Sequence, residues 1–305
     1  MKNVQTVLGE VAPSDLGFVL PHEHVFLDIY DITLNSNMIF SDRVVARREL
    51  EIYKEKGGNT IIDQTVHGLN ADPEALRDVA ADVGINIVAG TGFYWERFHP
   101  PWLADMSEAD IVRLMVSDLT VGFAGTDVRA GVIGEIGTHH REISPAEERV
   151  IRACSQTQQE VGVPIATHSL FTRIGMAQAQ AFESAGADLD KLVIGHVDTN
   201  PDVDYHEELL QFGVWIAYDS IGQLDKQSDE RRADAIVELI GRGYRDRILL
   251  STDVGKRAAL HAYGGNGYDH TITNFLPLLA ERGLSQVEID HLTKTNPQTL
   301  FSFPS

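Results

Sequence analysis

The sequence predicts a (β/α)₈ barrel, in which eight parallel strands alternate with helices. Short apolar segments recur along the chain, and longer amphipathic segments separate them. This alternation implies parallel pairing with right-handed crossovers, and eight strands is the number that closes such a barrel. The expected strands are residues 17–20, 60–63, 86–89, 131–136, 164–167, 191–195, 214–218 and 248–251.

Four helices are expected, and capping residues mark the starts of three of them. One helix is expected over residues 42–56. A second begins at Asp72, which is followed by a proline in the first turn, and Ser144 repeats this pattern. Ser107 stands three residues before an acidic residue, which is the pattern of a capping box.

The alternative fold is an open doubly wound sheet. Its usual signature is a glycine-rich phosphate loop after the first strand, but His22-Glu23-His24 stands at that place. No linker or internal repeat divides the sequence, so we expect one domain over residues 1–305. The first 15 or so residues are expected to form a small hairpin or lid over the bottom of the barrel.

The composition favours a soluble enzyme with a small-molecule substrate. The chain has 45 acidic and 25 basic residues and a formal net charge of −20, which argues against nucleic acid and anionic membranes as partners. Its one cysteine, Cys154, excludes an intrachain disulfide and is expected to be a buried, inert thiol. No apolar run approaches the ~20 residues that span a bilayer, and residues 1–7 lack the apolar core of a secretory signal. We therefore expect a cytoplasmic protein.

Two histidines follow the first expected strand. Side chains at positions i and i+2 of a strand share a face and lie roughly 7 Å apart, so His22 and His24 can bind one cation from the same side. A pair of hydrogen-bonded polar histidines at a strand end is the alternative interpretation.

Further metal-binding residue types occur at or after the ends of four later strands. They are Glu135, His168, His196 and Asp253. Taken singly, a histidine here is more often a core or loop residue, and an aspartate more often caps the next helix. A carboxylate in a segment as apolar as residues 132–136 needs a partner, because burying an unpaired charge is very costly.

In a barrel, these strand ends meet at one mouth. The ligand types fit two divalent ions: His22, His24 and Asp253 would hold one, His168 and His196 the other, and Glu135 would bridge them. A hydroxide shared by two such ions is a hydrolytic nucleophile at neutral pH.

These motifs resemble the phosphotriesterase family of the amidohydrolase superfamily, in order and over nearly the whole chain. The resemblance implies a (β/α)₈ barrel with a binuclear centre, usually zinc, and a possible homodimer. Manganese, cobalt or iron would suit the same ligands. The segments that carry the resemblance are Val4-Gln5-Thr6-Val7-Leu8-Gly9, His22-Glu23-His24, Gly131-Val132-Ile133-Gly134-Glu135-Ile136-Gly137-Thr138, Thr167-His168, Ile194-Gly195-His196, Ser251-Thr252-Asp253, Gly264-Gly265-Asn266-Gly267-Tyr268-Asp269 and Asn296-Pro297-Gln298-Thr299-Leu300-Phe301.

Two departures narrow the expected activity. Phosphotriesterases proper bridge their metals with a carboxylated lysine, whereas Glu135 stands there, as in the subgroup called phosphotriesterase homology proteins. This argues against efficient phosphotriester hydrolysis and leaves it as a weak side activity. Family lactonases that open acyl-homoserine lactones often carry an arginine after the aspartate that ends strand seven, but here Ser220 follows Asp219. This argues against acyl-homoserine lactones as substrates but not against lactones in general.

Three residues near the predicted metals are candidates for handling the substrate. Tyr94 resembles a tyrosine of the family's lactonases and would orient the nucleophile or donate to the oxyanion; an aromatic wall is the alternative. Lys256 and Arg257 form a basic pair just after Asp253, which suggests that they bind an anionic group, although a solvated or salt-bridged pair is equally open. Tyr268 and His270 are expected in the last loop and could line the pocket.

The expected function is hydrolysis of a carboxylic ester, most simply a lactone, by a metal-bridging hydroxide, with Asp253 transferring the proton. An amide-hydrolysing or deaminating enzyme is one alternative. By resemblance, deaminase barrels use one metal without a bridging acid, so Glu135 argues against them. A metal-containing binding protein without turnover is the other alternative.

Overall fold

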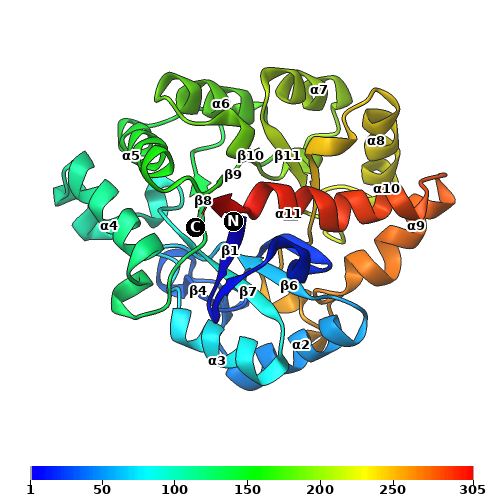
Figure 1. The fold of residues 1–305 in the computed structure, drawn as a ribbon, viewed down its shortest axis with the longest axis horizontal. Helices are drawn as coiled ribbons and strands as arrows, with labels where there is room; N and C mark the ends of the chain where they lie inside the picture. The colour runs from blue at the N-terminus through cyan, green and yellow to red at the C-terminus, as the bar shows by residue number, and fades with distance from the viewer. Residues whose placement is uncertain (1, 305) are drawn as a thin grey trace.

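The computed structural model describes residues 2–304 and contains a ring of eight parallel strands surrounded by helices (Figure 1). Each strand pairs with its neighbours in chain order, which confirms the barrel and rules out the reversed strand order of a doubly wound sheet. The strands are β3 (Val19–Glu23), β6 (Thr60–Asp63), β7 (Asn86–Thr91), β8 (Val132–Gly137), β9 (Ile165–His168), β10 (Leu192–Ile194), β11 (Trp215–Tyr218) and β12 (Ile248–Leu250).

The ring closes where the end of β3 meets the end of β12, at a junction we call the seam. The Asp253 N–H and the Ser251 hydroxyl both donate to the His22 carbonyl, at 3.2 and 2.9 Å. Glu23 lies between the two histidines of the first motif and is fully buried at this junction. Its carboxylate accepts hydrogen bonds from the Thr252 and Val254 N–H groups, both at 2.8 Å.

Helices lie between successive strands and form the outer layer in Figure 1. The three expected caps are confirmed: Asp72 accepts a hydrogen bond from a first-turn N–H group, and Ser107 and Ser144 form capping boxes. Asp42 also caps its helix, by accepting hydrogen bonds from the Val44 and Val45 N–H groups. The helices are α2 (Arg43–Glu55), α3 (Pro73–Val83), α4 (Glu108–Thr120), α5 (Pro145–Val161), α6 (Ile174–Ser184), α7 (Val203–Phe212), α8 (Asp229–Gly241), α9 (Leu276–Glu281), α10 (Gln286–Asp290) and α11 (Asn296–Phe301).

A hairpin covers the N-terminal end of the barrel, as expected. It consists of β1 (Lys2–Thr6) and β2 (Gly9–Val11), and β13 (Phe303–Pro304) pairs with β1. The Val7 N–H donates to the Ile87 carbonyl near the start of β7, at 2.8 Å. Both chain ends lie over the centre of the ring in Figure 1. The hairpin thereby seals the bottom of the barrel and leaves the opposite end for a site.

The loops after the first and the last barrel strand are joined at that opposite end. The first loop holds the short pair β4 (Leu27–Asp28) and β5 (Ile39–Phe40). Asn37 of this loop accepts a hydrogen bond from the Ala258 N–H of the last loop, at 2.7 Å. The buried carboxylate of Glu49 on α2 accepts two more, from the N–H groups of His261 and Ala262.

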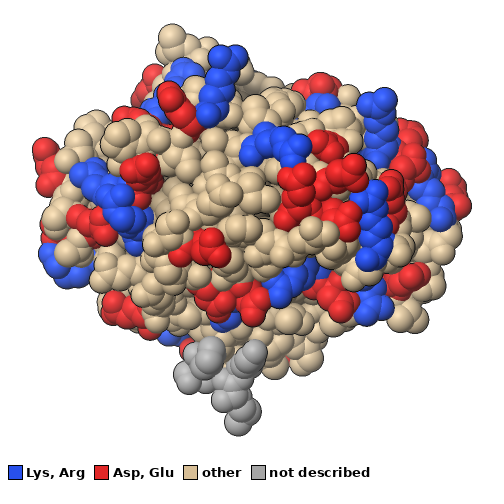
Figure 2. Space-filling model, turned by 90° about the horizontal axis from the view of Figure 1, so that it is seen from above, with Lys and Arg blue, Asp and Glu red and all other residues tan. Residues whose placement is uncertain are grey.

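Charges of opposite sign lie side by side on the surface. Figure 2 shows Lys and Arg next to Asp and Glu over the face drawn. Arg242 is an example, because it contacts Asp204, Glu207 and Glu238. Within residues 2–304, no helix combines the length and apolar character needed to cross a bilayer. Cys154 is buried, and burial raises the pKa of its thiol, which keeps the thiol protonated.

Candidate metal centre

The six predicted ligands come together at the C-terminal end of the barrel. They come from or directly follow β3, β8, β9, β10 and β12. Their side chains are at most 14% exposed. His196 and Asp253 have left-handed backbone conformations, with φ of 55° and 48°, which place both residues in sharp turns at the strand ends. Such conformations are strained for non-glycine residues and occur frequently in functional sites.

One half of the centre consists of His22, His24, Glu135 and Asp253. His24 Nε2 lies 3.7 Å from Glu135 Oε2 and 3.6 Å from Asp253 Oδ1. His22 Nε2 lies 3.5 Å from Glu135 Oε1 and is a buried atom without a hydrogen-bond partner among the described residues. Bonds of ~2.0–2.1 Å in a tetrahedral zinc site separate two ligand atoms by about 3.4 Å. These atoms are therefore spaced as ligands of one divalent ion.

The other half consists of Glu135, His168 and His196. His196 Nε2 lies 2.9 Å from Glu135 Oε1 and 2.9 Å from His168 Nδ1, and His168 Nδ1 also contacts Glu135 Oε1. Glu135 thus belongs to both halves. Each of the two overlapping groups could therefore hold a metal ion.

Asp219, at the end of β11, fixes two of the imidazoles. Its two carboxylate oxygens contact Nδ1 of His22 and Nδ1 of His196, both at 2.8 Å. Such contacts fix the tautomer and leave Nε2 free to bind a metal. The sequence analysis noted only that Ser220 follows Asp219. The sequence did contain a signal for this role, because Asp219 directly follows an expected barrel strand, as several of the predicted ligands do.

The electrostatics of the centre act differently on its side chains. Burial alone would lower the pKa values of His22 and His196, but the carboxylates of Asp219 and Glu135 raise both, so a metal must displace a proton from these imidazoles. Burial lowers the pKa of His168 to about 4, so this imidazole is neutral at pH 7, the form that binds metal. Burial by itself would raise the pKa of Glu135, but hydrogen bonds with His168 and His196 and the nearby His22 hold the pKa of this carboxyl well below its ordinary value. Glu135 is therefore ionised.

We expect Asp219→Asn to weaken metal binding by about 10- to 100-fold, which is typical when a carboxylate that hydrogen-bonds a metal-binding histidine is removed. The amide cannot accept from both imidazoles. Titration with a competing chelator measures this change. Asp118→Asn is the matched control, because Asp118 is also buried and contacts a histidine (His67, 2.7 Å) outside the ligand set. Equal affinities of Asp219→Asn and wild type would contradict the assigned role.

A pocket of about 330 Å³, which we call the metal-side pocket, opens onto the centre. Leu27, Met38, Leu170 and Phe171 form part of its apolar wall. Tyr94 lines this pocket, and its hydroxyl lies 3.0 Å from His168 Nε2. Burial raises the pKa of the Tyr94 phenol well above its usual value, so the hydroxyl remains a hydrogen-bond donor.

The sequence analysis missed two polar residues of the pocket. Both lie in the loop between β11 and α8. Lys226 is a lining residue whose side chain is 10% exposed, with Nζ 3.6 Å from Asp253 Oδ2. Gln223 Nε2 donates to Asp253 Oδ2 at 3.2 Å and to the Asp253 and Thr252 carbonyls. Asp253 therefore has one carboxylate oxygen near the ligand cluster and the other beside Gln223 and Lys226.

The predicted basic pair is split. Lys256 lines the metal-side pocket, with Nζ 3.6 Å from Asp225. Arg257 lines a separate pocket instead, where its guanidinium lies 5.1 Å from the centre of the Tyr263 ring. Tyr268 also lines that second pocket, and its hydroxyl donates to the His24 carbonyl at 2.7 Å. His270 contacts Asp229 at 2.8 Å. Neither Tyr268 nor His270 lines the metal-side pocket.

Comparison with known proteins identifies the family. The sequence model of the phosphotriesterase family matches residues 2–301 of the chain. The chain belongs to the phosphotriesterase family. It is 30% identical over 344 aligned positions to the N-acetyltaurine hydrolase of Danio rerio, with 98% of each chain covered. This membership, together with the ligand set, makes the chain a metal-dependent hydrolase.

Two solved structures of related proteins superpose over nearly the whole chain. The phosphotriesterase homology protein of Escherichia coli, with phosphate in its active site, has a TM-score of 0.91 and 32% identity, covering 94% of this chain and 99% of its own. A mutant phosphotriesterase-like lactonase of Deinococcus radiodurans has a TM-score of 0.87 and 34% identity, covering 98% and 99%. This phosphotriesterase-family chain therefore has relatives named for different substrates.

Proposed function

We propose that the protein hydrolyses a small carboxylic ester that carries an anionic group, most simply a lactone, with two divalent ions bound at the candidate centre. The observation that supports this most directly is the composition of the metal-side pocket. Four of the six candidate ligands line it (His24, Glu135, His168 and Asp253), much of its wall is apolar, and Lys226 and Lys256 supply two cations. An apolar pocket with a few placed polar groups is typical of small-molecule sites.

Bound divalent ions would supply Lewis acidity and would bring the pKa of water close to neutral. The remaining steps belong to side chains. Tyr94 donates a hydrogen bond to the oxygen of the attacked carbonyl, where negative charge develops. Asp253 accepts the nucleophile's proton and returns it to the leaving oxygen. Gln223 holds Asp253 in place, and the apolar wall excludes bulk water.

Amide hydrolysis is the second candidate. The relative named N-acetyltaurine hydrolase supports it, since N-acetyltaurine is an amide that bears a sulfonate. The two lysines suit this substrate as well as a phosphorylated or carboxylated lactone. The candidates differ in the leaving group, because an amine must be protonated as it leaves whereas a lactone oxygen is a better leaving group.

A substrate panel with elemental analysis tests the proposal. We expect two ions per chain in metal-replete protein, and turnover of phosphorylated or carboxylated lactones above that of N-acetyltaurine. The reverse ranking would favour the amide. One ion per chain would rule out the binuclear form. Metal-loaded protein without turnover on the whole panel would support the binding-protein alternative.

We expect Lys226→Met combined with Lys256→Met to lower kcat/KM for the anionic substrate by about 100-fold, because two charge-assisted hydrogen bonds are lost. The uncharged parent of the same substrate has no anionic group for these lysines to bind, so kcat/KM for this parent should change little. The ratio of kcat/KM for the two substrates is the measurement. Lys294→Met is the control, since Lys294 pairs with Asp290 in the C-terminal helical region and does not line the metal-side pocket. An equal loss for both substrates would assign the lysines a structural role.

A further inference from the structure

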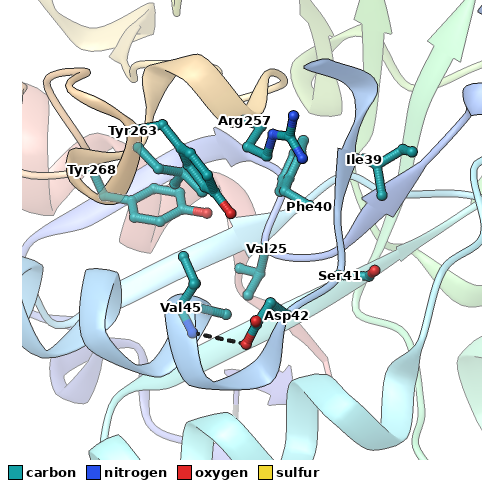
Figure 3. A pocket seen from close by; sticks show the side chains of 11 residues that line it. Val25, Ile39, Phe40, Ser41, Asp42, Val45, Arg257, Tyr263 and Tyr268 are labelled. Carbon is teal, nitrogen blue, oxygen red and sulfur yellow. Dashed lines mark hydrogen bonds between the residues drawn. The ribbon is translucent and has the colours of Figure 1, made fainter. Parts of the chain in front are cut away.

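A second pocket, which we call the side pocket, lies on the other side of one wall of the metal-side pocket. It has a volume of about 240 Å³ and lies between the first loop, the start of α2 and the last loop (Figure 3). Phe40, Tyr263 and Tyr268 give it an aromatic lining, and Val25 and Val45 add aliphatic surface. It contains none of the candidate metal ligands.

Arg257 is the only basic residue lining the side pocket. Most arginines of the chain contact a carboxylate, but within residues 2–304 no carboxylate lies within ion-pair distance of Arg257. Its guanidinium lies over the Tyr263 ring, and Figure 3 shows it at the edge of the cavity. Arg257 is half-buried, so a ligand's anion could pair with it away from bulk water. Arginine is suited to holding a carboxylate with two parallel hydrogen bonds.

The opposite side of the pocket limits the charge of a ligand. Asp42 lies there, and its Oδ1 already accepts hydrogen bonds from the Val44 and Val45 N–H groups (Figure 3). A second negative charge near Asp42 would be repelled. The volume is below the roughly 300–1,000 Å³ of pockets for drug-sized ligands, so the occupant has one ring or a short branched chain.

From these features we propose that the side pocket is a second ligand site, which binds a small amphipathic monocarboxylate. The carboxylate pairs with Arg257, and the apolar part packs between Phe40 and the two tyrosines.

The two pockets share a wall, through which a ligand in the side pocket could affect the metal centre. Three pairs of consecutive residues form this wall, and in each pair the first residue lines the metal-side pocket and the second lines the side pocket. The pairs are His24 and Val25, Met38 and Ile39, and Lys256 and Arg257. An occupant of the side pocket therefore contacts the same backbone segments that position a metal ligand and a substrate-binding lysine.

Calorimetric titration of the full-length, metal-loaded protein with phenylacetate tests the site. We expect binding of phenylacetate and much weaker binding of 2-phenylethanol, which has the ring but no charge. Arg257→Met should weaken phenylacetate binding by about 10- to 100-fold, the cost of a lost charge-assisted contact. Arg231→Met is the matched control, because Arg231 also lacks a carboxylate partner within the described chain and lies on α8 outside the pocket.

A second variant separates the side pocket from the metal centre, where a carboxylate could also bind. Val45→Trp fills the side pocket and should abolish phenylacetate binding, whereas Lys226→Met alters only the metal-side pocket and should leave it unchanged. Absence of binding to wild type at millimolar phenylacetate would overturn the proposal. So would affinity that survives Arg257→Met and Val45→Trp, or that is lost in Lys226→Met. Because the readout is binding and not turnover, the result is independent of the proposed hydrolytic reaction.

Discussion

Replacing Glu135 with glutamine is expected to lower turnover by about 10³-fold or more and to reduce the metal content, while the barrel remains folded. Glutamine keeps the shape but loses the charge and replaces one oxygen with an NH₂ group, which cannot bind a cation. Glu135 is the one residue shared by both halves of the ligand set. Without its charge, two adjacent dications would repel each other, and metal-ion catalysis contributes several kcal/mol to hydrolysis.

Elemental analysis, turnover and circular dichroism are measured together for this variant. Glu147→Gln is the matched control, because Glu147 is another buried glutamate, which accepts backbone hydrogen bonds from Glu96 and His139 outside the ligand set. Glu147→Gln should bind metal normally even if the loss of one acceptor oxygen lowers stability. Normal turnover and metal content in Glu135→Gln would show that Glu135 is not a ligand.

Asp253→Asn is expected to lower kcat by about 10²- to 10⁴-fold with little change in KM, which is the effect of removing a general acid–base group. The amide fits the same turn and can still accept from Gln223, but it cannot take up a proton. Steady-state kinetics separate the two parameters. A change confined to KM would limit Asp253 to substrate binding.

Asp225→Asn provides the comparison for that experiment. Asp225 is another carboxylate of the metal-side pocket, but it contacts Lys256 and not the ligand cluster. Its loss should alter KM for an anionic substrate and leave kcat nearly unchanged. A large decrease in kcat for both variants would point to a general effect of pocket charge.

The barrel and its ligands could be predicted from sequence because both depend on local patterns. Barrel strands are buried on both faces, so each appears as a short apolar run, and the first polar residue after it falls at the mouth of the barrel. His22 and His168 follow this rule, Asp253 comes one polar residue later, and the structure brings them together with the other three predicted ligands. Whether they bind two ions remains a prediction.

The residues that sequence analysis missed or misplaced lie in loops. Gln223 and Lys226 are in the loop between β11 and α8, where no periodic pattern indicates which side chains turn toward Asp253. Lys256 and Arg257 were expected to act as a pair. Lys256 has an extended backbone, with φ of −141° and ψ of 138°, and consecutive side chains on an extended backbone point in opposite directions. The two cations therefore enter different pockets.

The seam between β3 and β12 links the metal centre to the last stage of folding. Ser251, beside His22 at the seam, is 229 residues away from it in the chain. Contacts over such separations form late, since the entropy of closing the intervening loop opposes them until the rest of the ring is in place. Glu23 stays without its partners until then, and the ligand set of His22, His24 and Asp253 stays incomplete. Metal uptake during refolding would therefore report that the seam has closed. Bound metal would stabilise the closed ring relative to a partly folded state in which β12 has not yet joined β3.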